Sequence, residues 1–212
     1  MTLRQARPDD ATALAELMIM ADQAHYSSTG FALSLGGTRE FQLDQLAGLA
    51  RASARSGYHY SHFDVAENSG ATAVASVAGF DRASADNQIE PALLEIGWAQ
   101  HSISALFERI AGLGSCFPAE PPRTWTIEHV AVLPPYRGQS LAGQLLARVL
   151  ARGAAGGFER AMVDVFEGNS AARRVYIKAG FNTVCTFGHA EFTRILGRDG
   201  LERLEMPLRI AS

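Results

Sequence analysis

The chain has 212 residues, of which 47% are hydrophobic and 19% charged, and its formal net charge is −3. This composition supplies enough apolar side chains for a buried core and excludes a mainly disordered chain. The mild acidity offers no basic surface of the kind that binds nucleic acid, so we expect no nucleic-acid partner.

Targeting segments and metal-binding patterns are absent from the sequence. The first ten residues carry several charges and no apolar core of a signal peptide, and no run of about 18 apolar residues follows. We therefore expect a cytoplasmic protein without a membrane partner. Cys116 and Cys185 form neither a CxxC pair nor a zinc-ligand spacing, so we expect two ordinary thiols and no metal.

The first half of the chain predicts a strand and two helices, followed by a hairpin. Residues 2–6 are extended, and a Pro-Asp-Asp turn then begins an amphipathic helix with apolar residues at i, i+3, i+4 and i+7. Residues 25–37 are rich in Ser and Gly and predict a mobile loop that could cover a site, and residues 39–55 predict a second helix. Residues 58–66 and 71–80 are β-prone runs joined by Glu-Asn-Ser-Gly, which predicts an antiparallel hairpin.

The rest of the chain is irregular at first and then alternates cleanly. Residues 81–122 predict one helix near residues 102–111 and a Gly/Pro-rich loop, a long connection for a compact domain. Further helices are expected over residues 138–152 and 169–179. The expected strands are residues 123–133, 161–166, 181–187 and 201–209. Strands that alternate with helices imply partly parallel pairing, with the helices as crossovers.

A turn rich in small residues joins the strand over residues 123–133 to the next helix. It reads Val130-Ala131-Val132-Leu133-Pro134-Pro135-Tyr136-Arg137-Gly138-Gln139-Ser140-Leu141-Ala142-Gly143. The first turn of a helix has unpaired amides and the positive end of the helix dipole, and small residues let a ligand approach them. With Arg137 beside it, this turn predicts a phosphate site, although it is neither a GxGxxG fingerprint nor a P-loop. The alternative is a tight turn in which small residues serve packing alone.

A second motif surrounds a short helix. It reads Asn169-Ser170-Ala171-Ala172-Arg173-Arg174-Val175-Tyr176-Ile177-Lys178-Ala179-Gly180-Phe181. Asn169 suits an N-cap and Gly180 a C′ residue, so a helix of about three turns is expected between them. Tyr176 shares one face with Ala172 and Ala179, which by itself would fit a core aromatic residue with its hydroxyl at the rim.

Together the two motifs resemble those of the GCN5-related N-acetyltransferase (GNAT) superfamily. Residues 137–142 are similar to the R/Q-x-x-G-x-G/A acyl-CoA loop, and residues 169–181 to the N-x-x-A-x-x-x-Y-x-x-x-G-F signature. The resemblance implies an α/β (α+β) fold, in which helices flank a central mixed, mostly antiparallel sheet with one splayed parallel pair. It also implies one domain over residues 1–212, with an acyl-CoA-binding core at residues 123–187.

The resemblance further implies acetyl-CoA as co-substrate and a role for each motif. Strand residues Val130, Ala131 and Val132 would lie along the pantetheine arm. The pyrophosphate would be held by Arg137, Gly138, Gln139, Ser140, Leu141, Ala142 and Gly143. Asn169 would help to bind the cofactor, and Tyr176 would protonate the departing thiolate. Ser140 stands where the family usually has Gly, and a left-handed backbone there would cost on the order of 1 kcal/mol.

A base is also needed, because only a neutral amine attacks a thioester. Glu128 is the first candidate, since many family members carry a Glu on this strand, and the alternative is a solvated or ion-paired residue. Simple alternation places Glu128 on the face of Val130 and His129 on the opposite face. A β-bulge, frequent on this strand in the family, would exchange the faces and favour His129, while proton transfer through water remains open. His59 and His62, expected on an earlier strand, are interpreted as structural.

The expected activity is transfer of an acetyl group from acetyl-CoA to a primary amine of a small molecule by direct attack in a ternary complex. A backbone amide near Val132 would polarise the thioester carbonyl. Two alternatives remain: a protein N-terminal or lysine acetyltransferase, and a non-catalytic acyl-CoA-binding regulatory module. No motif identifies the acceptor amine. A homodimer is expected by analogy alone.

Overall fold

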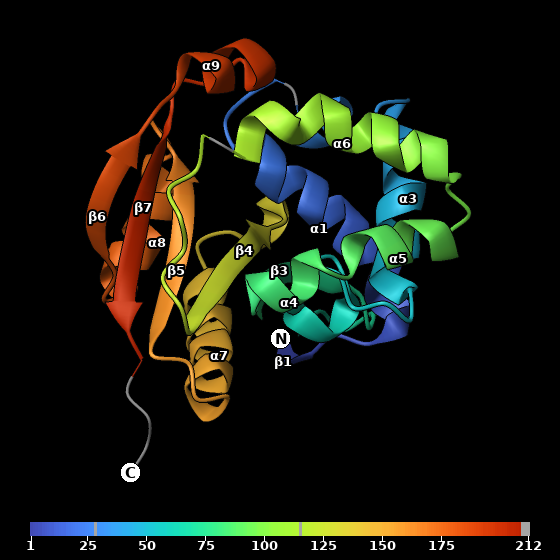
Figure 1. Ribbon diagram of the computed structural model, residues 1–212. Coiled ribbons are helices and arrows are strands. Elements are labelled where there is room, and N and C mark those ends of the chain that lie inside the picture. Colours follow the sequence, from blue (N-terminus) through green and yellow to red (C-terminus); the bar gives the residue numbers. More distant parts are fainter. Residues whose placement is uncertain (28, 115, 209–212) are drawn as a thin grey trace.

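The computed structural model describes residues 1–27, 29–114 and 116–208 (Figure 1). Within these residues seven strands form one sheet in the order β1-β2-β3-β4-β5-β7-β6. The strands are β1 (Thr2–Gln5), β2 (Phe63–Glu67), β3 (Ala73–Phe80), β4 (Thr124–Val132), β5 (Arg160–Phe166), β6 (Asn182–Phe187) and β7 (Leu201–Pro207). The predicted strand at residues 201–209 ends at Pro207, and residue 209 lies outside the described residues.

Five of the six neighbouring strand pairs are antiparallel, and β4–β5 is parallel. The parallel pairing joins residues 124–126 to residues 160–162 and goes no further, although both strands continue. The two strands therefore splay apart, as Figure 1 shows. This confirms the expected mixed sheet with one splayed parallel pair.

Helices cover both faces of the sheet. They are α1 (Ala11–Gln23), α2 (Gly30–Ser34), α3 (Arg39–Arg51), α4 (Arg82–Asp86), α5 (Ile89–Glu95), α6 (Gln100–Gly114), α7 (Leu141–Ala155), α8 (Ser170–Ala179) and α9 (Ala190–Leu196). Helices α1 and α3 share one core with Phe63 and Ala131, whereas α7 and α8 share the other with Ile127 and Val163. Helix α6 contacts α9 above α1 in Figure 1.

The apolar periodicity of α1 and α7 explains how these helices pack. Leu14, Leu17 and Met18 of α1 are fully buried, as are Leu145 and Val149 of α7. Burying one such side chain stabilises the fold by about 1.5–3 kcal/mol. These two helices therefore anchor opposite faces of the strands that carry the candidate site.

Two expectations for the first half of the chain were wrong. Residues 25–37 are not simply a loop: Thr29 caps α2 by accepting a hydrogen bond from the amide of Ala32, and Phe31 of α2 is buried. His59 and His62 do not lie on a strand, because the His59 side chain accepts the amide of Ser61 and starts a 3-10 helix. The hairpin itself is confirmed.

The irregular parts of the sequence contain more helix than predicted. The expected helix near residues 102–111 is α6, but α4 and α5 precede it and α9 lies between β6 and β7. Both α4 and α9 are short, so neither shows a clear apolar period in the sequence. The helix expected from residue 138 begins at Leu141 instead, because Gly138 and Ser140 have positive φ angles of 80° and 58°.

Helix α7 approaches β3 so closely that Gly79 is required there. A methyl group at this position would overlap Val149 and Trp125, whose indole N–H donates to the Val149 carbonyl at 3.1 Å. We predict that Gly79→Ala lowers the free energy of unfolding by about 1–3 kcal/mol, measured by chemical denaturation. Gly70→Ala in the hairpin turn is the control, since its methyl would make only an ordinary contact with Asn68. Equal effects of the two variants would contradict this packing.

Candidate active site

The splay leaves one edge of β4 open. The amide of Leu133 donates to the carbonyl of Val74 on β3 at 2.9 Å. The backbone N–H and C=O groups of successive strand residues point to opposite sides. Because Leu133 bonds to β3, the backbone groups of Val132 and Val130 point away from β3. They face the space where β5 has diverged. An extended chain such as pantetheine can therefore pair with this edge, as β5 would have done.

A β-bulge interrupts β4 at His129. Ser76 on β3 is opposite Ala131 and Ala78 is opposite Glu128, so one residue of β3 faces two of β4. His129 has a φ of 52°, a left-handed conformation that His adopts more readily than most residues. The side-chain hydroxyl of Ser76 donates to the His129 carbonyl at 3.0 Å.

The bulge changes which side chains share a face. His129 packs against Phe63, and Glu128 lines a cavity with Tyr58, so both side chains lie on the face covered by α1 to α6. Val130 instead joins the core beneath α7 and α8. The simple alternation that put Glu128 with Val130 is therefore wrong after the bulge, and Glu128 and His129 become neighbours.

Glu128 is held by a guanidinium group. Its Oε1 accepts from Arg82 Nη2 at 2.6 Å, and its Oε2 lies 3.5 Å from His129 Nε2. Burial raises the pKa of Glu128, but the charge and hydrogen bond of Arg82 outweigh burial and bring the pKa below its ordinary value. The side chain is therefore a carboxylate at neutral pH.

His129 lies in an aromatic box. Its ring stacks on Phe63 at 5.7 Å between centroids and lies 5.6 Å from Tyr58 and 6.5 Å from Phe31. Burial lowers the pKa of His129 more than nearby Glu128 raises it, so the imidazole is neutral at pH 7. Its Nε2 has no hydrogen-bond partner in the part of the chain that the structure describes.

Tyr176 lies on the opposite side of the sheet, in the core beneath α7. The residue is 3% exposed on α8, and its ring meets Phe181 edge-on at 5.7 Å. Burial raises the pKa of the Tyr176 phenol, and the negative charge of Glu128 raises it further. The phenol thus stays protonated, and it lies close enough to Glu128 for the two groups to interact electrostatically.

The amino-terminal turn of α7 forms an open cradle of backbone groups. Ser140 precedes the helix in a left-handed conformation (φ 58°, ψ 20°) and supplies no side-chain cap among the described contacts. A methyl group added at Gly138 or Gly143 would meet nothing within 4 Å, so a ligand can approach the backbone there. The left-handed Ser140 is the strained departure considered from the sequence, at a cost on the order of 1 kcal/mol.

Arg137 and Asn169 already have roles within the fold. The Nε of Arg137 donates to the Val132 carbonyl at 3.1 Å, which brings this exposed side chain to the open strand edge. The side-chain oxygen of Asn169 caps α8 by accepting from the amide of Ala172 at 3.2 Å. Asn169 is therefore an N-cap, as predicted, and its contact with a cofactor remains a proposal.

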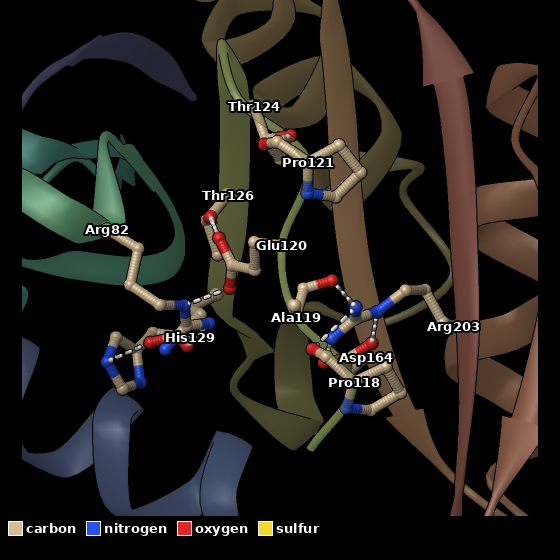
Figure 2. A network of polar contacts seen from close by, with 11 residues as sticks. Arg82, Pro118, Ala119, Glu120, Pro121, Thr124, Thr126, His129, Asp164 and Arg203 are labelled. Atoms are coloured by element: carbon tan, nitrogen blue, oxygen red, sulfur yellow. Dashed lines mark hydrogen bonds and ion pairs between the residues drawn. The ribbon is translucent and has the colours of Figure 1, made fainter. Parts of the chain in front are cut away.

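The segment of residues 118–121 runs between β4 and β5 and contacts both sides of the gap (Figure 2). On one side the Glu120 carboxylate accepts from Thr126 Oγ1 at 3.1 Å and from Arg82. On the other side Arg203 donates to the carbonyls of residues 118 and 119 at 3.0 and 3.1 Å and pairs with Asp164. The segment thus ties the Arg82–Glu128 pair to β5 and β7.

A cavity of about 580 Å³ ends at Glu128. It lies between the sheet and helices α2 to α6, and its remaining polar lining includes Arg82, Asp86 and Tyr58. Sequence reasoning identified Glu128 but missed these three residues. Arg82 and Asp86 lie in a segment whose apolar residues show no clear helical or strand periodicity. The only signal that could have indicated them is the group of charged residues that follows the β-prone run of residues 71–80.

A family model for the acetyltransferase (GNAT) family matches residues 75–181, from β3 through both motifs. The chain belongs to the GNAT family. Members of this family use acetyl-CoA, so this GNAT protein is an acetyltransferase that transfers an acetyl group to an acceptor substrate. A search of curated protein sequences found no significant match.

Solved structures share the fold of this GNAT protein at low sequence identity. An N-acetyltransferase from Staphylococcus aureus Mu50 has a TM-score of 0.73 at 18% identity, over 97% of this chain and 100% of that one. YncA, a putative acetyltransferase from Salmonella typhimurium determined with its cofactor acetyl-CoA, has a TM-score of 0.54 at 15% identity, with coverages of 100% and 96%. The ribosomal-protein-S18-alanine N-acetyltransferase from Escherichia coli has a TM-score of 0.52 at 13% identity, also with 100% and 96%.

The described part of the GNAT protein contains neither a membrane-spanning helix nor a metal-binding cluster. No helix among the described residues is long and apolar enough to cross a bilayer. The same residues contain no group of three or more His, Cys, Asp or Glu side chains placed to hold a metal ion.

A substitution at Gly143 should change the stability of the fold and the binding of acetyl-CoA in opposite directions. We predict that Gly143→Ala stabilises the protein by about 0.4–1 kcal/mol, because Ala restricts the unfolded chain and clashes with nothing in α7. The same methyl would occupy the approach to the helix amides and weaken acetyl-CoA binding about tenfold by calorimetry. Ala147→Ser, on an exposed position of α7, should leave the affinity unchanged. Undiminished binding by Gly143→Ala would place the phosphates elsewhere.

Proposed function

We propose that this protein is an N-acetyltransferase that transfers the acetyl group of acetyl-CoA to a primary amine of a small molecule by direct attack in a ternary complex. One observation carries the proposal: two separate approaches converge on the bulge of β4. The open strand edge and the α7 cradle approach it from one side, and the cavity that ends at Glu128 approaches it from the other.

Backbone groups on the proposed cofactor side support this assignment. Residues 137–143 offer uncapped amides at a helix start for the pyrophosphate, and Val130 and Val132 offer backbone groups to pantetheine. A backbone amide on this edge near Val132 would stabilise negative charge on the thioester oxygen. Bound acetyl-CoA would supply the activated acetyl group.

The reaction needs a base to take a proton from the amine and an acid to give a proton to the thiolate. Glu128, an ionised carboxylate beside the cavity, would take the proton from the acceptor amine, directly or through water. Neutral His129, 3.5 Å away, is the second candidate for this role. Tyr176, whose raised pKa keeps it protonated, would give its proton to the thiolate as the carbon–sulfur bond breaks.

The shape of the acceptor side favours a small molecule. The cavity of about 580 Å³ is lined on several sides by residues of α2 to α6, whereas a peptide would need a groove open along its length. The Escherichia coli neighbour is named for a ribosomal-protein acceptor, and this name supports the protein-acetyltransferase alternative. Acetyl-CoA binding without turnover of any amine would favour the regulatory module.

Tyr176→Phe tests the proton donor. We expect kcat to fall by about 10²–10⁴-fold, because the thiolate would leave without a positioned acid. The dissociation constant of acetyl-CoA, measured by calorimetry, should change less than about threefold, since the phenyl ring keeps its packing against Phe181. An unchanged kcat would remove Tyr176 from the mechanism.

Glu128→Gln tests the base against a matched carboxylate. Turnover at saturating acetyl-CoA, followed by thiol release, should fall by about 10²-fold or more. Glu120→Gln removes the other carboxylate on Arg82 and should lower turnover by less than about tenfold, because Glu120 points toward Thr126 rather than into the cavity. Equal losses would mean that the charge on Arg82, and not the Glu128 base, is what matters.

A further inference from the structure

We infer that the acceptor is an amine carried on an aromatic or branched aliphatic body and lacking a carboxylate beside the amino group. This inference rests on the proposed function and specifies its substrate class. It comes from two properties of the cavity: the apolar character of its deep walls and the sign of the charge at its polar end.

The deep walls of the cavity are apolar. They are formed by side chains from α2, α3, α5, α6 and β3, among them Phe31, Leu46, Leu49, Phe80, Leu93 and Leu106. These six are at most 6% exposed to solvent. A polyamine or a sugar would leave polar groups without partners here, whereas an apolar body gains the free energy of transfer from water.

The polar end carries excess negative charge. Arg82 is the only Lys, Arg or His among the cavity-lining residues that the structure describes, and Glu128, Glu120 and Asp86 surround it. Glu120 and Glu128 already accept its hydrogen bonds. Burial raises the pKa of Asp86 against the opposing effect of Arg82, but the two glutamates alone outnumber the guanidinium.

This arrangement attracts an ammonium group and repels a carboxylate. A cationic amine can approach Glu128 and lose its proton there, while its apolar body occupies the space between the apolar walls of the cavity. An amino acid would bring its carboxylate to the same end, because the carboxylate and the amine are attached to one carbon, and the described cavity-lining residues include no unpaired cation to meet it. Like charges brought together in a desolvated site oppose binding strongly.

The test uses matched pairs of acceptors with the full-length protein and acetyl-CoA. Tryptamine and phenethylamine are compared with tryptophan and phenylalanine, which differ from them only by the carboxylate, and with spermidine and a short peptide with a free amino terminus. Thiol release measures kcat/KM. We expect each apolar amine to exceed its amino acid by about 50-fold or more, and to exceed spermidine and the peptide likewise.

Filling the cavity tests the location of the apolar body. Leu93→Trp, at a lining position of α5, should raise KM for tryptamine about tenfold while the acetyl-CoA dissociation constant stays unchanged. Leu94→Trp is the control, because Leu94 is 46% exposed on the same helix and does not line the cavity. Should Leu93→Trp not fold, the partly exposed lining residue Ile110 offers Ile110→Trp with the same expectation.

The outcomes separate this inference from the function on which it rests. Preference for an amino acid or spermidine would overturn the inference and leave acetylation of a small-molecule amine intact, whereas preference for the peptide would overturn the small-molecule acceptor as well. An unchanged KM in a folded filling variant would also overturn it. If acetyl-CoA binds and no amine in the panel releases thiol, the proposed function itself fails.

Discussion

The site depends on the place where β4 loses its parallel partner. Past residue 126 the strand has no β5 neighbour, and a bulge at His129 turns two successive side chains to the same face. Unpaired strand edges are costly unless something satisfies them, so this edge is suited to a ligand with its own amides. The bulge also gives the acceptor side a carboxylate and an imidazole where a regular strand would present only one of them.

Arg82 sets the chemistry available to that carboxylate. Buried carboxylates tend to be protonated, and a protonated Glu128 could not accept a proton from an amine. The guanidinium reverses this tendency and lowers the basicity of Glu128 at the same time. Because Arg82 also pairs with Glu120, its single positive charge offsets only part of the negative charge of the two glutamates. Segment 118–121 therefore belongs to the site although it contributes no group to the proposed reaction.

The sequence identified the parts of the site that are built locally. The small residues around α7, the Asn169 cap and Tyr176 are specified within about 15 residues each, where helix ends and periodicity give a readable signal. Arg82, Asp86 and Tyr58 were missed because only the tertiary fold brings them close to Glu128; Arg82, for example, is 46 residues away in the sequence. The 25–37 segment was misinterpreted for a similar reason: Phe31 orders α2 through its contacts with Tyr58 and His129, which are distant in sequence.

The contrast between locally built and tertiary parts of the site also distinguishes the family motifs from the features particular to this chain. The proposed cofactor side is made of backbone groups and small residues, and Ser140 keeps an amide at the helix start while it adopts a left-handed conformation. The proposed acceptor side is made of side chains from α2 to α6, where the local signals in the sequence are weakest. A backbone-built half can persist through extensive substitution, whereas each wall of the cavity changes with a single side chain. Acceptor specificity in this protein should therefore follow the residues of α5 and α6 rather than the motifs that reveal the family.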